Sequence, residues 1–131
     1  MSRGAHRLSR VVLMGIVAVA FALVGCSASM PARAITEGPL QVEVSQLWIT
    51  VVNTSSSPLI DVRVTVEAVA AQEFTATYGR LEPGQRRNFG YADLRNRDGT
   101  PFNRQVHRPR IVRVSASDTA RQPYQVELPW R

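Results

Sequence analysis

The sequence predicts an all-β fold, a single sandwich of about seven short strands, on three observations. From Leu40 onward, apolar residues alternate with polar ones over short segments, which is the period of a strand with one buried face. Turn-forming residues separate these segments, as in Leu81-Glu82-Pro83-Gly84. No window of eleven residues after Cys26 has the apolar period of a helix.

The strands are expected, in chain order, at 40–44, 47–52, 60–66, 74–78, 88–91, 112–116 and 124–128. The third has the clearest alternation, with one apolar face formed by Ile60, Val62, Val64 and Val66. The second is apolar on both faces, so we expect it to be covered on both sides. Pro129 ends the last strand, which we therefore place at a sheet edge.

The connections between the predicted strands contain turn-forming residues. Residues 53–58 form a loop by composition, and Pro83 with Gly84 suits a tight turn. Residues 93–109 are a long irregular connection, in which Asp98-Gly99 predicts a hairpin-like turn. Three aromatic residues are expected to cover the core or the sheet edges rather than to bind carbohydrate: Trp48, Phe102 and Trp130.

The first 25 residues have the pattern of a secretory signal peptide. Arg3, Arg7 and Arg10 precede an uncharged apolar run over 11–25. A helix that spans a bilayer needs about 20 apolar residues, so this run is short for a membrane span. Removal of the segment would lower the net charge from +6 to +3, because it contains three arginines and no acid.

The apolar run ends in Leu23-Val24-Gly25-Cys26, which resembles the lipobox of bacterial lipoproteins. The resemblance implies a diacylglyceryl group on the Cys26 thiol, cleavage between Gly25 and Cys26, and an acyl group on the freed amine. Two or three acyl chains hold a protein on a membrane essentially permanently. Beyond this covalent lipid no cofactor is expected. The resemblance also implies the bacterial cell envelope, and Ser27 favours the outer membrane facing the periplasm.

Residues 26–38 are expected to form the lipidated N-terminus and a flexible tether, because they have no apolar period and include Pro31 and Gly38. The sandwich domain is expected at 39–131. Cys26 is the only cysteine, so the domain has no disulfide and its core must hold the fold alone. A chain of about 100 residues can bury enough surface for this.

Three segments of the predicted domain, 49–55, 58–64 and 81–84, resemble the immunoglobulin-like and fibronectin III-like domains of bacterial envelope lipoproteins. The resemblance extends over Leu40 to Trp130 and implies two packed antiparallel sheets. The chain departs from antibody-type domains because it lacks their pair of core cysteines.

We expect no enzymatic activity. Removal of the signal segment leaves His107 as the only histidine, and the spacing of Ser55, Asp61 and His107 does not indicate a catalytic triad. Two pairs of carboxylates are expected to be solvated charges rather than catalytic pairs: Glu67 with Glu73, and Asp93 with Asp98.

No metal site is expected. Asn96-Arg97-Asp98-Gly99 resembles part of a calcium loop, but Leu94 and Gln105 stand where its first Asp and its bidentate Glu belong. A turn on Asp98-Gly99 is the better interpretation. Asn53-Thr54-Ser55 matches a glycosylation acceptor, but a turn role for Asn53 suits a bacterial protein better.

One surface feature is distinctive, because no acid occurs between Thr100 and Ser117. The candidate residues for binding an anion or an acidic partner are Arg104, His107, Arg108, Arg110 and Arg113. The alternation of residues 108–114 predicts that Arg113 points away from Arg108 and Arg110, so solvated arginines remain the simpler interpretation. A nucleic-acid partner is not expected, because aromatic residues do not interleave with the arginines.

These observations predict a lipid-anchored, non-enzymatic envelope protein whose sandwich binds a protein partner or serves in assembly. The alternative is a lipoprotein that binds a small ligand, a glycan or an anionic lipid through the Arg-rich region 93–113. Fold alone does not select between them.

Overall fold

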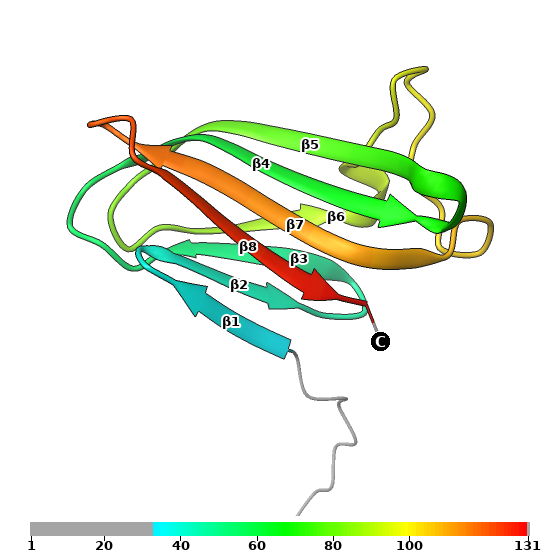
Figure 1. Cartoon of the computed structure of the whole chain (residues 1–131), viewed down its shortest axis with the longest axis horizontal. Helices are drawn as coiled ribbons and strands as arrows, with labels where there is room; N and C mark the ends of the chain where they lie inside the picture. The colour runs from blue at the N-terminus through cyan, green and yellow to red at the C-terminus, as the bar shows by residue number, and fades with distance from the viewer. Residues whose placement is uncertain (1–32, 131) are drawn as a thin grey trace, which may run out of the picture.

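The computed structural model describes residues 33–130, which form a sandwich of two four-stranded antiparallel sheets (Figure 1). One sheet has the order β1-β2-β3-β6 and the other β5-β4-β7-β8. The strands are β1 (Arg33–Glu37), β2 (Leu40–Val44), β3 (Trp48–Asn53), β4 (Leu59–Ala68), β5 (Gln72–Leu81), β6 (Arg86–Gly90), β7 (Pro109–Asp118) and β8 (Pro123–Pro129). The predicted signal peptide and the lipobox Leu23-Val24-Gly25-Cys26 lie outside the described residues.

The all-β prediction is confirmed, and each of the seven expected strands is present as β2 to β8. β8 ends at Pro129 on a sheet edge, as its sequence predicts. Among residues 33–130 no helix is long and apolar enough to cross a membrane.

An eighth strand, β1, occupies residues that the sequence analysis assigned to the tether. It pairs with β2 along its whole length, from Arg33 opposite Val44 to Glu37 opposite Leu40. All five of its residues are exposed, so the strand has no apolar period in the sequence. It forms because β2 offers an unpaired edge, which periodicity cannot reveal. The predicted tether is therefore too long at its C-terminal end.

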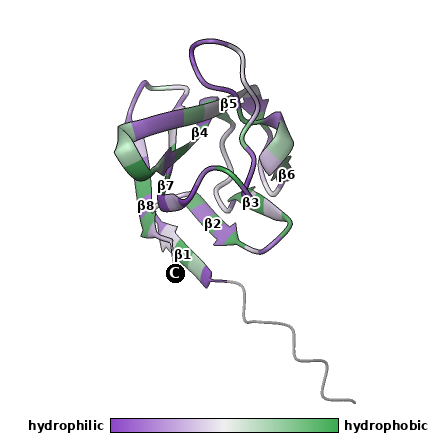
Figure 2. Cartoon of the chain, turned by 90° about the vertical axis from the view of Figure 1, so that its right-hand side faces the viewer, coloured by the Kyte–Doolittle hydropathy of each residue, from purple (hydrophilic) through white to green (hydrophobic). Residues whose placement is uncertain are grey.

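The core is a layer of aliphatic and aromatic side chains between the two sheets. Alternate residues of the strands point into it, and Figure 2 shows the corresponding alternation of green and purple along the ribbons. Its largest fully buried side chains are Phe74, Leu40, Ile49, Leu59, Leu81, Leu94, Val42, Val51, Val62, Val64, Val66 and Val112.

A β-bulge in β4 corrects one expectation about this core. The register of β4 against β7 shifts between Ile60 and Arg63, and Asp61 takes a positive φ of 53°. The extra residue changes the side of the sheet on which the preceding residues lie. Leu59 is therefore fully buried, whereas Ile60, expected to share a face with Val62, is only half-buried.

Asn53, at the end of β3, joins the two sheets. Its buried side-chain amide donates hydrogen bonds to the carbonyl oxygens of Ser57, at 2.7 Å, and Leu81, at 3.1 Å. Its side-chain oxygen accepts hydrogen bonds from the backbone N–H and the hydroxyl of Ser55. The predicted turn role of Asn53 is confirmed.

The predicted turn after Leu81 is also formed. Gln85 N–H donates to the Glu82 carbonyl at 3.0 Å, and Gly84 takes a φ of 72°. The Gly84 N–H in turn donates to the Asn53 carbonyl at 2.8 Å. The β3–β4 and β5–β6 connections are therefore tied together at one end of the sandwich.

We expect Asn53→Ala to lower the free energy of unfolding by about 2–3 kcal/mol, because it leaves the buried Leu81 carbonyl without its donor. Urea denaturation monitored by tryptophan fluorescence measures this. The matched control is Ser56→Ala in the same loop, where an exposed side chain is changed and a loss below about 0.5 kcal/mol is expected. Equal losses in the two variants would contradict the role assigned to Asn53.

Candidate functional site

The outward face of the sheet β5-β4-β7-β8 is polar along its central strands. Arg63 stands on β4 between the buried Val62 and Val64, so its side chain points outward. Its register partners are Thr77 on β5 and Ser115 on β7. This face therefore presents an exposed guanidinium flanked by two hydroxyl-bearing residues.

A short hairpin, residues 95–101, stands beside this face. Arg95 exchanges backbone hydrogen bonds with Thr75 at the edge of β5, with N–O distances of 2.8 and 3.1 Å. The base of the hairpin is fixed by Leu94 and Phe102, which are both buried and are joined by a 2.8 Å backbone hydrogen bond. The hairpin is therefore held on the sheet at both of its ends.

The tip of the hairpin is a tight turn, as Asp98-Gly99 predicts. The Asn96 side-chain oxygen accepts the backbone N–H of Asp98 at 3.0 Å and of Thr100 at 2.9 Å. Gly99 takes a φ of 81°. Since backbone donors satisfy this side-chain oxygen, the turn holds its shape with protein groups alone.

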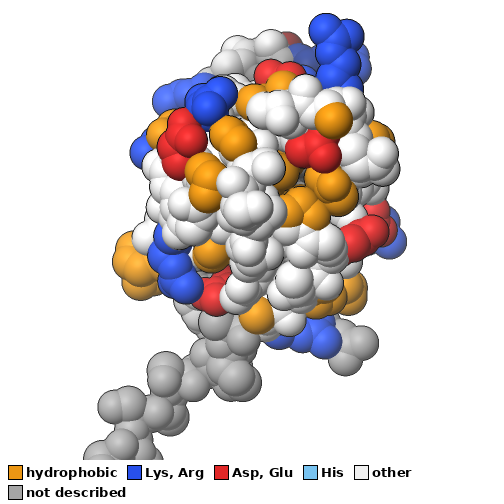
Figure 3. Space-filling view, turned by 90° about the vertical axis from the view of Figure 1, so that its left-hand side faces the viewer, with side chains coloured by type: hydrophobic (Ala, Val, Ile, Leu, Met, Phe, Trp, Pro, Cys, Tyr) orange, Lys and Arg blue, Asp and Glu red, His pale blue; other side chains and the backbone are white. Residues whose placement is uncertain are grey.

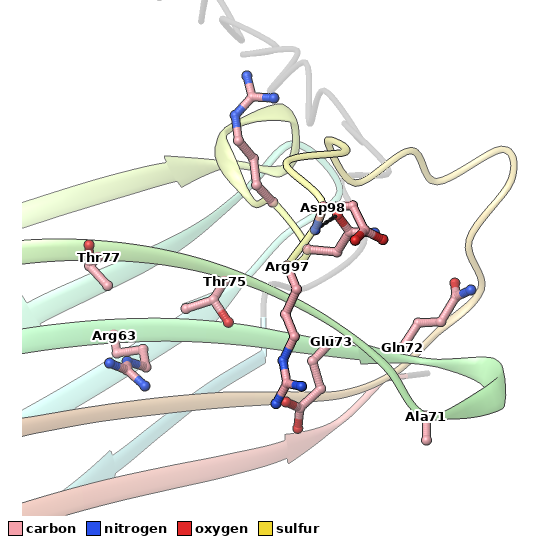
Figure 4. Close-up of a pocket in the computed structure, with 10 residues that line it drawn as sticks. Arg63, Ala71, Gln72, Glu73, Thr75, Thr77, Arg97 and Asp98 are labelled. Carbon is pink, nitrogen blue, oxygen red and sulfur yellow. Dashed lines mark hydrogen bonds between the residues drawn. The ribbon is translucent and has the colours of Figure 1, made fainter.

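The hairpin and the outward face enclose an open cavity of about 760 Å³ (Figure 4). A second cavity of about 440 Å³ continues along β4 and β5 past Asp61 and Gly79. Arg63 and Thr77 line both cavities, so we describe them together as the β4–β5 groove. Figure 4 shows Arg97 extending from the hairpin toward Glu73 on β5.

The β4–β5 groove carries equal numbers of opposite charges. Its lining includes three positively charged residues, Arg63, Arg95 and Arg97, and three negatively charged ones, Asp61, Glu73 and Asp98. Among the described residues, Arg63 makes no ion pair or hydrogen bond. The groove can therefore bind an extended polar ligand that itself carries both charges, such as a segment of another protein.

The polar groups that line the groove are guanidinium, carboxylate, hydroxyl and amide groups. Its lining contains no histidine or cysteine, and residues 33–130 hold no group of three His, Cys, Asp or Glu residues placed to bind a metal. Ser55 and His107 lie at opposite ends of β4, which at ten residues is about 30 Å long. Ser55, Asp61 and His107 therefore do not meet.

The structure also shows where the acidic residues considered as pairs in the sequence lie. Glu67 and Glu73 stand opposite one another on β4 and β5, and Arg113 lies 3.9 Å from Glu73. Asp93 accepts a hydrogen bond from the backbone N–H of Gly90 at 3.1 Å, which fixes a single turn at the end of β6.

The five residues proposed from the sequence as an anion-binding cluster do not form one patch. Arg113 lies on the outward face of β7, where its guanidinium meets Glu127 at 3.1 Å and Glu73 at 3.9 Å. Its outward position follows the alternation of Val112 and Val114, although a register shift between Pro109 and Ile111 interrupts that alternation at Arg110, and two acids compensate its charge. Arg108 and Arg110 are exposed, and their side chains make no hydrogen bond, ion pair or ring contact with residues 33–130.

Arg104 supports the domain from the long connection. Its guanidinium lies 5.4 Å from the ring centres of both Tyr91 and Trp130 and donates a hydrogen bond to the Gln46 carbonyl. The Tyr91 hydroxyl donates to the Ser45 carbonyl at 2.5 Å. These contacts tie the 103–108 loop and the β2–β3 turn to the core, so Arg104 is occupied by the protein itself.

His107 is likewise part of the packing. Its ring lies 4.5 Å from the ring of Phe74 and 5.7 Å from that of Phe102, measured between centres. Its Nδ1 accepts the backbone N–H of Asn103 at 3.0 Å. A histidine that closes a loop in this way has only Nε2 available for anything else.

The three aromatic residues differ in their surroundings. Phe102 is buried and Trp130 is partly buried against the core, as expected. Trp48 is 43% exposed, so of the expected places, core or sheet edge, it does not lie in the core. It stands at the start of β3, opposite Gly90 in register.

Sequence reasoning did not find the β4–β5 groove. Arg63, Thr75 and Thr77 have the polar positions of ordinary half-buried strands, and nothing in their spacing separates them from solvated surface residues. The nearest signal was the Asp98-Gly99 turn, which predicted a hairpin but not the strand it would lie against.

Comparisons of this chain with protein-family models, with curated proteins and with solved structures return no match.

We expect His107→Leu to loosen the 103–108 loop with little effect on the rest of the domain. The change removes the acceptor of the Asn103 N–H, and the loop amides should exchange hydrogen roughly fivefold faster, equivalent to about 1 kcal/mol. Hydrogen exchange measured by mass spectrometry tests this, with Gln105→Leu in the same exposed loop as the control. Unchanged exchange in His107→Leu would show that the ring does not hold the loop.

Burial raises the pKa of Tyr91 to about 12, against the opposing effect of the Arg104 guanidinium. The neutral phenol is therefore favoured in the folded state. Its contribution to stability is complete below pH 10, the unfolded value, and is lost as the pH rises through about 12. We expect the free energy of unfolding to fall less steeply between pH 10 and 12 in Tyr91→Phe than in the wild type. Parallel curves would contradict this, since Tyr78 and Tyr124 are present in both proteins.

Proposed function

We propose that this chain is a lipid-anchored, non-enzymatic protein of the bacterial cell envelope that binds a protein partner through the β4–β5 groove. The observation that carries the proposal is the groove itself, with its balanced charges and the uncompensated guanidinium of Arg63. Pockets for small molecules are mostly apolar. A polar groove on an open sheet face suits the mixed charges of a protein surface better.

The lipid anchor rests on the sequence. The basic, apolar and lipobox segments occur in the order that lipoprotein processing needs, and Cys26 ends them. Lipidation there would place the sandwich at a membrane surface, and Ser27 favours the outer membrane facing the periplasm. The groove would then face an environment in which other envelope proteins are at high local concentration.

The finer fold assignment belongs to the same proposal. When β1 is set aside, β2, β3 and β6 form one sheet, while β4, β5, β7 and β8 form the other. This division supports a fibronectin III-like arrangement of the seven predicted strands. The β1 strand would be an addition at the edge beside β2.

A photo-reactive amino acid placed at Thr77 in the full chain, in native membranes, tests the groove. We expect one predominant protein adduct, which Arg63→Glu in the same chain reduces severalfold, because it reverses the uncompensated charge. The matched control is the same photo-reactive amino acid at Thr36, an exposed threonine of β1 in the other sheet. Adducts of equal yield at both positions, or none at Thr77, would refute the proposed site.

The anchor has a separate test. We expect Cys26→Ala to abolish lipid attachment and processing, so that intact mass shows no acyl groups and the protein no longer sediments as the wild type does. Ser27→Ala is the control, since it changes a small residue after the cleavage point. A Cys26→Ala protein processed to wild-type size and still held in membranes would show that residues 23–26 are not a lipobox.

A second candidate function is binding of an anionic glycan by the Arg-rich region. It is favoured by Arg108 and Arg110, which are exposed and have no side-chain partner among the described residues. Envelope glycans would then raise the melting temperature of the protein in a salt-dependent manner, and Arg108→Ala with Arg110→Ala would remove the effect.

A further inference from the structure

The described chain enters the sandwich at one particular end. β1 begins at Arg33, opposite Val44, the last residue of β2. The β2–β3 turn, residues 45–48, follows directly, and the Arg33 guanidinium donates to the carbonyl of Pro129 at the end of β8. Figure 1 shows the start of β1, the β2–β3 turn and the C-terminus at the same end, which Figure 2 views face on.

Exposed apolar side chains gather at this end. Five large apolar residues are exposed among residues 33–130, and four of them lie here: Val106 (70%), Leu47 (66%), Val69 (52%) and Trp48 (43%). Two contacts bring their segments together, the hydrogen bond from the Val69 N–H to the Arg108 carbonyl and the one from Arg104 to the Gln46 carbonyl. The fifth, Ile35, lies on β1 close by.

The charges on these segments have one sign. The β2–β3 turn and the β4–β5 connection, residues 69–71, contain no charged residue. The 103–108 loop and the adjoining strand ends contribute Arg33, Arg104, Arg108 and Arg110. The same strand ends also carry Glu43, Glu67 and Glu73, of which Glu43 lies 3.5 Å from Arg86 and Glu73 lies 3.9 Å from Arg113. An apolar surface whose own turns and loop carry arginine as their only charged residue has the composition that an anionic membrane surface attracts.

The backbone segments that carry Leu47 and Val106 are held in place by hydrogen bonds and ring contacts. The Ser45 hydroxyl donates to the Trp48 carbonyl at 2.9 Å, and its backbone N–H does so at 3.0 Å, which closes the turn that carries Leu47. Arg104 and His107 fix the loop that carries Val106. A rigid arrangement loses little conformational entropy when it meets a surface.

We propose that this end of the sandwich is a membrane-contact surface that docks on anionic phospholipid, with Leu47, Trp48 and Val106 in the headgroup region and the exposed Arg108 and Arg110 on the phosphates. The inference rests on the proposed lipidation of Cys26. Arg33 is seven positions after Cys26, with six residues between them, so the entry point lies at most about 25 Å from the lipid. Tryptophan favours the membrane interface, and basic residues near the surface contribute about 1 kcal/mol each.

Docking in this way would fix the orientation of the domain. The opposite end, formed by the 54–58 loop, the turn at 82–85 and the β7–β8 turn, would point away from the membrane. Figure 3 shows that end, where apolar side chains are scattered among polar and charged ones. The β4–β5 groove would then stand on the side of the domain, open to a partner.

The test uses the full lipidated chain carrying Trp130→Phe, which leaves Trp48 as its only tryptophan, reconstituted in vesicles. On phosphatidylethanolamine–phosphatidylglycerol vesicles, we expect the Trp48 emission to shift to the blue and to be quenched by brominated lipid. Leu47→Ser with Val106→Ser should remove most of the shift. Phosphatidylcholine vesicles should give a smaller one, and a shift of equal size on both would contradict the role of the arginines.

The matched control carries Trp130→Phe, Trp48→Phe and Ser56→Trp, which moves the same fluorophore to the exposed loop at the opposite end. Its emission should not respond to the vesicles. Hydrogen exchange of the unaltered protein gives a readout free of substitutions, with protection expected at 45–48 and 103–108 but not at 54–58.

Flotation of the vesicles separates the two hypotheses. Protein that floats while Trp48 behaves like the control at position 56 would overturn the membrane-contact surface and leave the anchor intact. Protein that does not float would overturn the proposed lipidation, and the docking inference with it.

Discussion

The layer of aliphatic side chains between the two sheets is the interaction on which the rest of the structure depends. The chain has one cysteine, at position 26, so no disulfide joins the sheets. Val62, Val64 and Val66 of β4 are completely buried against the facing sheet, and Leu94 and Phe102 extend the same layer beneath the long connection. Every loop with a functional interpretation is attached to this layer. Their geometry is therefore only as firm as the packing beneath them.

Departures from regular structure shape the surface above that layer. The bulge at Asp61 turns the start of β4, and the hairpin held to Thr75 forms one wall of the β4–β5 groove. At the end where the described chain enters, Arg104 and His107 hold the 103–108 loop against four aromatic rings, those of Phe74, Tyr91, Phe102 and Trp130. The two proposed surfaces lie on different parts of one rigid domain. They adjoin at Ala71, which ends the 69–71 connection and also lines the β4–β5 groove.

The alternation of apolar and polar residues correctly predicted burial where burial depends only on the two-residue period of a strand. Val112, Val114 and Ala116 were expected to share a face, and all three are buried. The expectations that failed involve information from outside the strand. Ile60 left the core because of a bulge, and β1 formed because a neighbouring edge was open. Alternation placed Arg113 on the outward face of β7, but its two acidic partners come from other strands.

The sequence by itself determined the strands β2 to β8, the turns at Gly84 and Gly99, and the lipobox hypothesis, because each depends on residues within a few positions of one another. Only the tertiary structure decided which side chains meet. It joined Arg63 with Arg97 in the lining of one groove and collected Leu47, Trp48, Val69 and Val106 at one end. Those residues are distant in the chain, and their proximity follows from sheet order and register. The spacing of residues within a short stretch of sequence contains no information about sheet order or register.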